Sequence, residues 1–157
     1  MSQSVVQCFS EEGALAKAIP GFKARQSQLD MAKAVASAIK DKKELVVEAG
    51  TGTGKTFAYL APALLTGRKV IVSTGTKALQ EQLFHRDLPL VKKALKPGMR
   101  TALLKGRSNY LCLYRLDQNS HHAPFDDDDF ANDMSHVRRW SSETDSGDIG
   151  ELTAIEE

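Results

Sequence analysis

The sequence predicts an α/β fold, in which a parallel sheet is covered by helices on both faces, followed by an irregular acidic segment. Short β-branched runs alternate with stretches of helical periodicity, and a glycine-rich loop joins the first run to the next stretch. The charges divide unequally, since residues 1–115 hold 19 Lys and Arg against 8 Asp and Glu, and residues 116–157 hold 2 against 12. A basic body suits nucleic acid or a polyphosphate, and the acidic segment suits a solvated insertion or linker.

Three stretches have the apolar spacing of helices. Apolar residues recur at helical intervals from Gln26 to Ile39, which predicts an amphipathic helix. Residues 55–65 predict a second helix, with Pro62 as a site for a kink. A third helix is expected to begin near Lys77 and to be ended or bent by Pro89.

The predicted strands are short, apolar and separated by these helices. Residues 45–48, 69–73 and 101–104 read as three buried strands. Strands that alternate with helices indicate a parallel sheet with right-handed crossovers. The first 105 or so residues therefore read as half of a doubly wound domain.

The remaining sequence is polar and gives little periodicity. After Tyr114 the chain is rich in Asp, Ser and His, which predicts an irregular segment with a short helix around residues 130–140. Two cysteines, Cys8 and Cys112, do not make a disulfide framework, and no signal peptide or membrane span is visible. A cytoplasmic protein without a membrane partner is expected.

The loop after the first predicted strand carries the strongest chemical signal. Its glycines allow the backbone to curl with N–H groups directed at a phosphate, at a helix N-terminus whose dipole favours an anion. Lys55 would reach the β- and γ-phosphates of a nucleoside triphosphate, and the Thr56 hydroxyl would bind Mg²⁺. The common pattern has glycine where Ala49 stands. The predicted nucleotide-binding residues of this loop are Ala49, Gly50, Thr51, Gly52, Thr53, Gly54, Lys55 and Thr56.

Two further places carry weaker signals. Thr74 and Thr76 lie at the carboxyl end of a predicted parallel strand, where short hydroxyl side chains suit a nucleic-acid phosphate. A helix cap by Thr76 explains the same pattern equally well. Gln28 offers both a donor and an acceptor to an adenine edge, although an exposed helix residue is the plainer interpretation.

Four blocks of sequence, taken in order, resemble one known family. They are F-K-A-R-Q-S-Q at residues 22–28, E-A-G-T-G-T-G-K-T at 48–56, S-T-G-T-K-A-L-Q-E-Q-L at 73–83 and K-G-R-S-N-Y-L-C at 105–112. They are similar to the amino-terminal part of the DinG/YoaA family of XPD-like iron-sulphur superfamily 2 DNA helicases, and more so to its YoaA branch. The run of four blocks is more specific than any single one.

The resemblance implies a fold and a function. Residues 1–115 would be the amino-terminal part of an incomplete RecA-like P-loop NTPase domain, and residues 116–157 a truncated, acidic part of an iron-sulphur insertion. The full-length protein would be an ATP-dependent DNA helicase of 5′–3′ polarity, acting in DNA repair or replication on single-stranded or forked DNA. It would use ATP and Mg²⁺, with Lys55 and Thr56 as catalytic residues, and a 4Fe-4S cluster in the full-length form only.

The resemblance also implies roles for residues outside the loop. Arg25 and Gln28 would form the adenine-reading Q motif, and Cys112 would be the first of four cysteine ligands of the cluster. From its own surroundings in the sequence, Cys112 reads as a small apolar residue of the kind usually buried. The implied contacts with single-stranded DNA are Thr74, Thr76 and Gln80.

The chain also departs from the family pattern. No Asp-Glu box follows a later buried strand, and the Asp126–Asp129 run follows Pro124 and Phe125, so it reads as a solvated acidic loop. Cys8 lies too far upstream to join Cys112 in a cluster. We therefore expect the start of a longer protein, with weak nucleotide binding and no useful hydrolysis in these 157 residues.

Two other classes of protein remain open at this stage. A small P-loop phosphotransferase begins in the same way but needs lid arginines, for which Arg138 and Arg139 are the late candidates, and a salt-bridged helix face accounts for both. A non-catalytic nucleotide- or nucleic-acid-binding module would show salt-sensitive single-strand affinity without ATPase activity.

Overall fold

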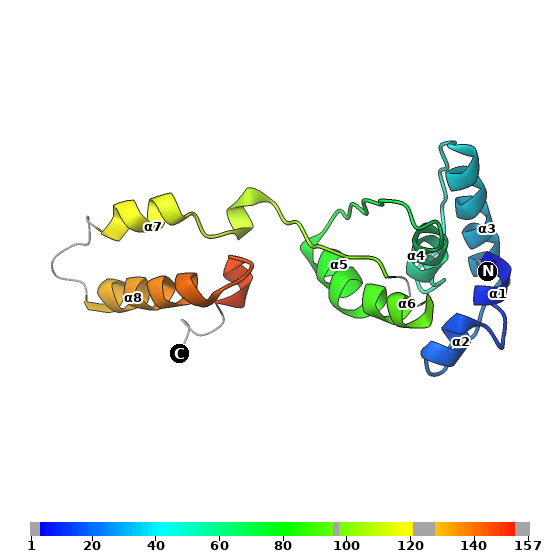
Figure 1. The fold of residues 1–157 in the computed structure, drawn as a ribbon, viewed down its shortest axis with the longest axis horizontal. Coiled ribbons are helices and arrows are strands. Elements are labelled where there is room, and N and C mark those ends of the chain that lie inside the picture. The colour runs from blue at the N-terminus through cyan, green and yellow to red at the C-terminus, as the bar shows by residue number, and fades with distance from the viewer. Residues whose placement is uncertain (1–3, 96–97, 121–127, 153–157) are drawn as a thin grey trace. The chain divides into compact units, whose positions relative to one another are not determined.

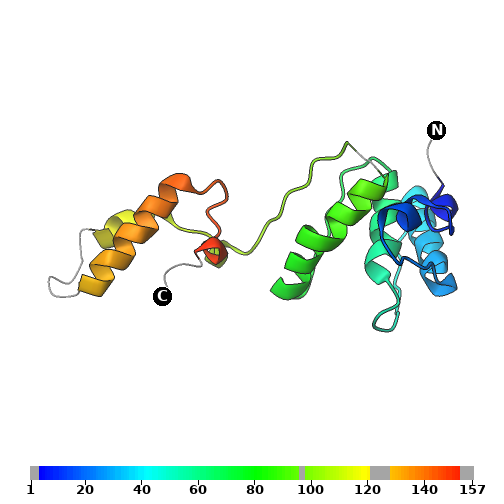
Figure 2. The ribbon, with the colours of Figure 1, turned by 90° about the horizontal axis from the view of Figure 1, so that it is seen from below.

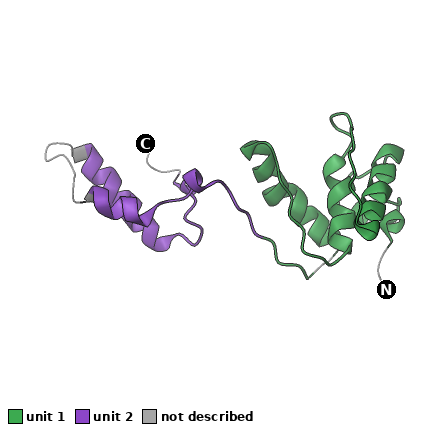
Figure 3. Ribbon diagram, turned by 90° about the horizontal axis from the view of Figure 1, so that it is seen from above, with its two compact units in different colours: residues 1–101 green, residues 102–157 purple. Residues whose placement is uncertain are grey.

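The computed structural model describes residues 4–95, 98–120 and 128–152. The chain forms two compact units, residues 1–101 and residues 102–157 (Figure 3). The division predicted after residue 115 concerned the helicase motor domain and its iron-sulphur insertion, not compact units of the fold, and it stays a prediction.

Helices build the described part of the first unit (Figure 1). Both long predicted helices are confirmed, at residues 26–41 and 55–65, and Pro62 lies buried within the second. The elements in chain order are α1 (Val5–Cys8), α2 (Ala14–Ala18), α3 (Gln26–Asp41), α4 (Lys55–Leu65), α5 (Lys77–Gln82), the π-helix η1 (Leu83–Asp87) and α6 (Leu88–Leu95).

The core of the first unit forms around α4, whose most extensive contact is with α3 (Figure 2). Three aromatic rings connect the amino-terminal segment to this core, because Phe22 lies 6.3 Å from Phe9 and 6.2 Å from Phe57 between ring centroids. Burial of such side chains is the main stabilising contribution to a helical unit of this size. The buried core residues are Cys8, Phe9, Leu15, Ala32, Ala58, Leu60, Ala61, Leu64 and Val91.

The third predicted helix continues through Pro89 instead of ending there. A π-turn, η1, lies directly before α6, and the Leu88 N–H bonds to the Leu83 carbonyl five residues back. A proline inside an α-helix removes one hydrogen bond and crowds the carbonyl four residues earlier. The wider π-turn relieves this crowding, so the chain passes from α5 to α6 without a break.

The three predicted strands do not pair within the described part of the chain, so the parallel sheet is not confirmed. Segments 45–48, 69–73 and 101–104 run as coil. Their side chains are open to solvent, with Val46 98% and Ile71 87% exposed. A helix makes its hydrogen bonds within one stretch, whereas a strand depends on neighbours supplied by distant sequence. The described segments do not supply these neighbours to one another.

The second unit corrects the prediction of an irregular segment. Its described elements are η2 (Arg107–Asn109), α7 (Leu113–Ser120), α8 (Asp128–Glu143) and η3 (Ile149–Glu151). The helix expected around residues 130–140 is confirmed and is longer than predicted. Phe130, Met134 and Val137 are half-buried at helical spacing, and this apolar face stabilises α8 despite its acidic composition.

The acidic-loop interpretation of the Asp126–Asp129 run is wrong where it can be compared with the structure. Asp128 and Asp129 belong to the first turn of α8, while residues 126 and 127 lie outside the described residues. The acidic side chain of Asp129 in this first turn interacts favourably with the helix dipole, which favours a helix start at this point. Within the described ranges, no helix combines the length and apolar character needed to cross a lipid bilayer.

Candidate nucleotide-binding site

The predicted phosphate loop forms a tight curve that leads directly into α4. Gly52 and Gly54 have φ angles of 72° and 77°, and α4 begins at Lys55. A side chain at either glycine would be strained, because this region of φ is unfavourable for L-residues. The Thr53 hydroxyl donates to the Gly50 carbonyl at 2.9 Å and closes the turn. The loop therefore has the backbone conformation that brings N–H groups together at a helix N-terminus.

Lys55 places its positive charge against the start of the same loop. Its ammonium donates to the Ala49 carbonyl at 2.6 Å and to the Gly50 carbonyl at 2.8 Å. The cation, the loop N–H groups and the positive end of the α4 dipole thus lie within one short segment. This combination can bind a phosphate group.

Thr56, the predicted Mg²⁺ ligand, lies in the first turn of α4 and is half-buried. Burial raises the pKa of the phenol of Tyr59, the Thr56 side chain opposes this rise, and the Asp87 carboxylate raises the pKa further. Asp87 is itself buried on η1, where it accepts hydrogen bonds from Gln82 at 3.1 Å and Arg86 at 2.9 Å. The phenol therefore stays protonated and neutral beside Thr56.

Two side chains from the start of α3 reach the phosphate loop. Arg25 Nη1 donates to the Gly52 carbonyl at 2.7 Å, and Gln28 Nε2 donates to the Gly54 carbonyl at 3.0 Å. Gln28 is only 5% exposed, so its interpretation as an exposed helix residue is wrong. Because it lies four residues before the buried Ala32, it shares the face of α3 that packs on α4.

The two threonines after residue 73 are placed at the start of α5. Thr76 is the N-cap of this helix, and its hydroxyl accepts from the Leu79 N–H at 3.2 Å, which confirms the capping interpretation. The Thr74 hydroxyl donates to the Thr76 carbonyl at 3.3 Å, and Gln80 is half-buried on α5. The structure brings these residues together at one helix end, and a role in DNA binding stays a prediction.

Cys112 belongs to the second unit and precedes α7 directly. Backbone hydrogen bonds, first from Arg115 and then from Tyr114, hold the pKa of its thiol below the ordinary value, with smaller contributions from the Arg107 and Arg115 charges; partial burial opposes them. Cys8 differs, because its burial in the core of the first unit raises its pKa. Within the part of the chain that the structure describes, no group of three or more His, Cys, Asp or Glu could hold a metal ion.

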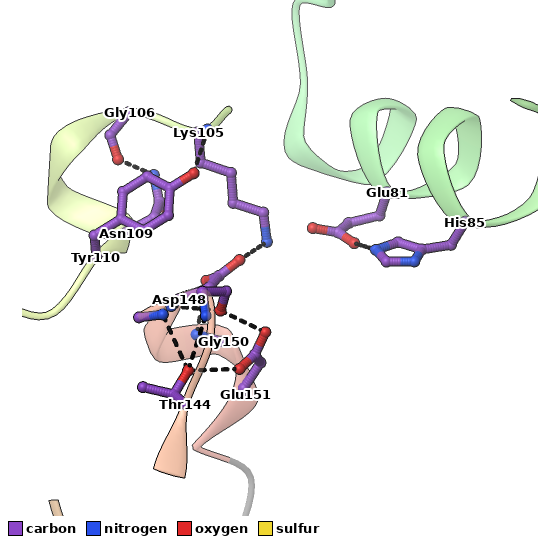
Figure 4. A network of polar contacts seen from close by, with 12 residues as sticks. Glu81, His85, Lys105, Gly106, Asn109, Tyr110, Thr144, Asp148, Gly150 and Glu151 are labelled. Atoms are coloured by element: carbon purple, nitrogen blue, oxygen red, sulfur yellow. Dashed lines mark hydrogen bonds and ion pairs between the residues drawn. The ribbon is translucent and has the colours of Figure 1, made fainter. Parts of the chain in front are cut away.

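Sequence reasoning missed an ion pair that organises the second unit. Lys105 Nζ lies 2.5 Å from Asp148 Oδ2, and both side chains are largely buried (Figure 4). The Lys105 N–H donates to the Tyr110 hydroxyl at 2.8 Å, and the Leu111 N–H donates to the Gly147 carbonyl at 2.8 Å. The segment that ends in Cys112 is therefore fastened to the acidic segment. No spacing or motif in the sequence indicated Asp148.

Comparisons with known proteins agree with the resemblance drawn from the four blocks. A model of the DEAD/DEAH box helicase family matches residues 29–122. The chain is similar to the ATP-dependent DNA helicase YoaA of Haemophilus influenzae, with 53% identity over 98% of this chain and 24% of the relative. Similarity to YoaA of Escherichia coli is 56% identity over 95% of this chain and 23% of the relative.

A DinG protein provides a more distant comparison. The chain is 38% identical to the 3′-5′ exonuclease DinG of Bacillus subtilis, over 90% of this chain and 16% of the relative. The chain thus spans about a quarter or less of the length of these curated relatives. No solved structure matches the chain.

Proposed function

Because this chain belongs to the DEAD/DEAH box helicase family, we propose that it provides the phosphate-binding part of an ATP-dependent DNA helicase. The observation that carries the proposal is the loop at residues 49–56, in which two positive-φ glycines lead into α4 and the Lys55 ammonium lies against the loop. The curated relatives named YoaA, each described as an ATP-dependent DNA helicase, support the same activity.

Different groups of the loop and of α4 bind different parts of Mg²⁺-ATP. The N–H groups of the loop and of the first turn of α4 bind phosphate oxygens, and Lys55 neutralises charge on the β- and γ-phosphates. Thr56 supplies a hydroxyl for Mg²⁺. Bound ATP supplies the phosphoanhydride bond whose hydrolysis drives the helicase. Adenine reading by Arg25 and Gln28 belongs to this proposal.

The fold proposed for this activity is RecA-like, with a parallel sheet. Family membership supports the RecA-like fold. The apolar segments 45–47 and 70–72 support the sheet, because exposed β-branched runs of this kind are typical of strands that pair in a complete sheet. The strand at residues 45–48 would then support the start of the phosphate loop.

DNA is the proposed substrate, in single-stranded or forked form and with 5′–3′ movement. Thr74, Thr76 and Gln80 are the proposed contacts, supported by their position at the start of α5. Short hydroxyls and helix N-terminal N–H groups suit backbone phosphates. A DNA substrate is also consistent with the cytoplasmic location predicted from the sequence.

The implied 4Fe-4S cluster does not fit the residues of this chain alone. Such a cluster takes four thiolates, and the sequence holds two cysteines, of which Cys8 is buried in the core of the first unit. Cys112 has the lowered pKa of a thiol that readily becomes a ligand. We assign Cys112 as one ligand in the full-length protein and derive no step of the reaction from the cluster.

ATP binding and hydrolysis by the 157-residue chain and by its Lys55→Ala variant test the proposal. We expect the chain to bind ATP weakly, Lys55→Ala to weaken binding at least ten-fold by removing a charged hydrogen bond, and neither form to turn ATP over. Binding that Lys55→Ala leaves unchanged would contradict the phosphate-loop assignment. Turnover that Lys55→Ala abolishes would show that the chain alone is an enzyme.

A further inference from the structure

The two positive-φ glycines of the phosphate loop have their carbonyls held by side chains of α3. Arg25 bonds to the Gly52 carbonyl at 2.7 Å and Gln28 to the Gly54 carbonyl at 3.0 Å. We infer that Arg25 and Gln28 are positioning residues that fix the curvature of the phosphate loop, and so control affinity for the triphosphate whatever base it carries. This inference rests on the proposed function and deepens it.

The physical reason lies in the geometry of a backbone anion site. Consecutive N–H groups converge on an anion only when the carbonyls between them point outward. The donors on Arg25 and Gln28 oppose rotation of the peptide units whose carbonyls they bind, and the Gly54 carbonyl also accepts from the Ala58 N–H at 3.2 Å at the start of α4. Arg25 provides a charged donor, which makes the stronger kind of hydrogen bond. The site is thereby organised before a ligand arrives.

Gln28 is closely fitted to this task. It is 5% exposed, and a Cβ built on Gly54 would lie 2.2 Å from Gln28 Nε2. The amide therefore fills the space that a side chain at residue 54 would need, and one of its N–H donors is engaged by the loop. A glutamine whose function was confined to adenine would have no need of this contact.

The two interpretations predict different ligand dependence, so the test compares ATP with inorganic tripolyphosphate, which has no base. Titration calorimetry on the 157-residue chain measures both affinities for wild type, Gln28→Ala and Arg25→Gln. Matched controls are Gln26→Ala, whose amide bonds to Asp30 on its own helix, and Lys23→Gln, which removes a nearby exposed charge. We expect each test variant to weaken tripolyphosphate binding about five-fold, the effect of one lost hydrogen bond, and ATP binding at least as much, because the proposed adenine contacts would be lost as well. The controls should leave both affinities unchanged.

Two readouts separate a positioning role from a general loss of structure. Arg25→Lys keeps a cationic donor and is expected to restore most of the affinity lost in Arg25→Gln. Without any ligand, the backbone NMR signals of Gly52 and Gly54 are expected to shift in Gln28→Ala and to stay in place in Gln26→Ala. A weakened affinity for ATP with tripolyphosphate unchanged would overturn the inference in favour of adenine reading. Unmoved glycine signals would overturn it as well.

The Lys55→Ala variant separates failure of this inference from failure of the proposed function. If Lys55→Ala abolishes tripolyphosphate binding while Gln28→Ala and Arg25→Gln bind as wild type, the phosphate loop stands and the positioning role falls. If wild type binds neither ligand, or if Lys55→Ala binds both as wild type does, the proposed function and the positioning role fall together.

Discussion

Replacing Gly54 by alanine tests how tightly the phosphate loop is fitted to α3. Gly54 has a φ of 77°, where a non-glycine residue costs roughly 1–2 kcal/mol. Its new Cβ would also lie 2.2 Å from Gln28 Nε2, so the amide must move and release the Gly54 carbonyl. Loss of that hydrogen bond adds about 1 kcal/mol. We therefore expect Gly54→Ala to lower the free energy of unfolding by about 2–3 kcal/mol.

Gly52 provides the matched control for this change. Its φ is 72°, nearly the same as at Gly54, but a Cβ at this position would have no atom within 4 Å. Gly52→Ala should therefore show the conformational cost alone, about 1–2 kcal/mol. The difference between the two variants measures the contact with Gln28.

Urea unfolding followed by the helical circular dichroism signal gives the five free energies that are needed: wild type, Gly52→Ala, Gly54→Ala, Gln28→Ala and the variant with both Gly54→Ala and Gln28→Ala. Removing the Gln28 side chain should reduce the further cost of Gly54→Ala to that of Gly52→Ala, a coupling of about 1 kcal/mol. Equal costs at Gly52 and Gly54, or a Gly54→Ala cost unaffected by Gln28→Ala, would refute the fitted contact.

Three further predictions concern other parts of the chain. Thr76→Ala removes the N-cap of α5 and should lower the free energy of unfolding in urea by about 1 kcal/mol. Thr76→Ser keeps the hydroxyl and should be close to wild type. Equal losses of stability in the two variants would exclude a capping role. Asp148→Asn removes the carboxylate that pairs with the largely buried Lys105 ammonium and should destabilise the second unit by about 3 kcal/mol. Hydrogen exchange of the backbone amides of residues 105–111 measures this loss, and unchanged protection would contradict the prediction. Because the pKa of the Cys112 thiol is lowered, the rate at which iodoacetamide alkylates it should rise with pH and level off at a lower pH than for a free cysteine. Cys8 is buried and has a raised pKa, so it should react only in denaturant. Equal alkylation rates at the two cysteines would contradict both assignments.

Local features of the structure could be predicted from sequence, because their hydrogen bonds lie within one stretch. The helices at residues 26–41 and 55–65 follow from apolar spacing, and the phosphate loop follows from its glycines. A strand such as 69–73 carries the correct composition, but its pairing depends on residues far away in sequence. Composition alone therefore could not establish whether the described chain forms a sheet.

Two errors came from considering residues singly. Gln28 is polar and lies near the start of a helix, which favours exposure, but its four-residue spacing from Ala32 places it on the buried face. The acidic segment was predicted to be irregular apart from a short helix around residues 130–140, although the helical spacing of Phe130, Met134 and Val137 belongs to a longer helix that runs from Asp128 to Glu143. In both cases the position on the helix face carried more information than the type of residue. Asp148 differs, since its partner Lys105 lies 43 residues earlier and no local pattern connects them.

The same division between local and distant interactions bears on function. The proposed phosphate-binding groups lie between residues 49 and 56, and side chains of α3 bond to the Gly52 and Gly54 carbonyls, so none of these contacts depends on a paired strand in the described chain. Hydrolysis also requires groups that position water and metal against the γ-phosphate, and distant parts of a chain supply these. Nucleotide binding should therefore be separable from turnover. We therefore expect the chain to bind tripolyphosphate through Lys55 without hydrolysing ATP.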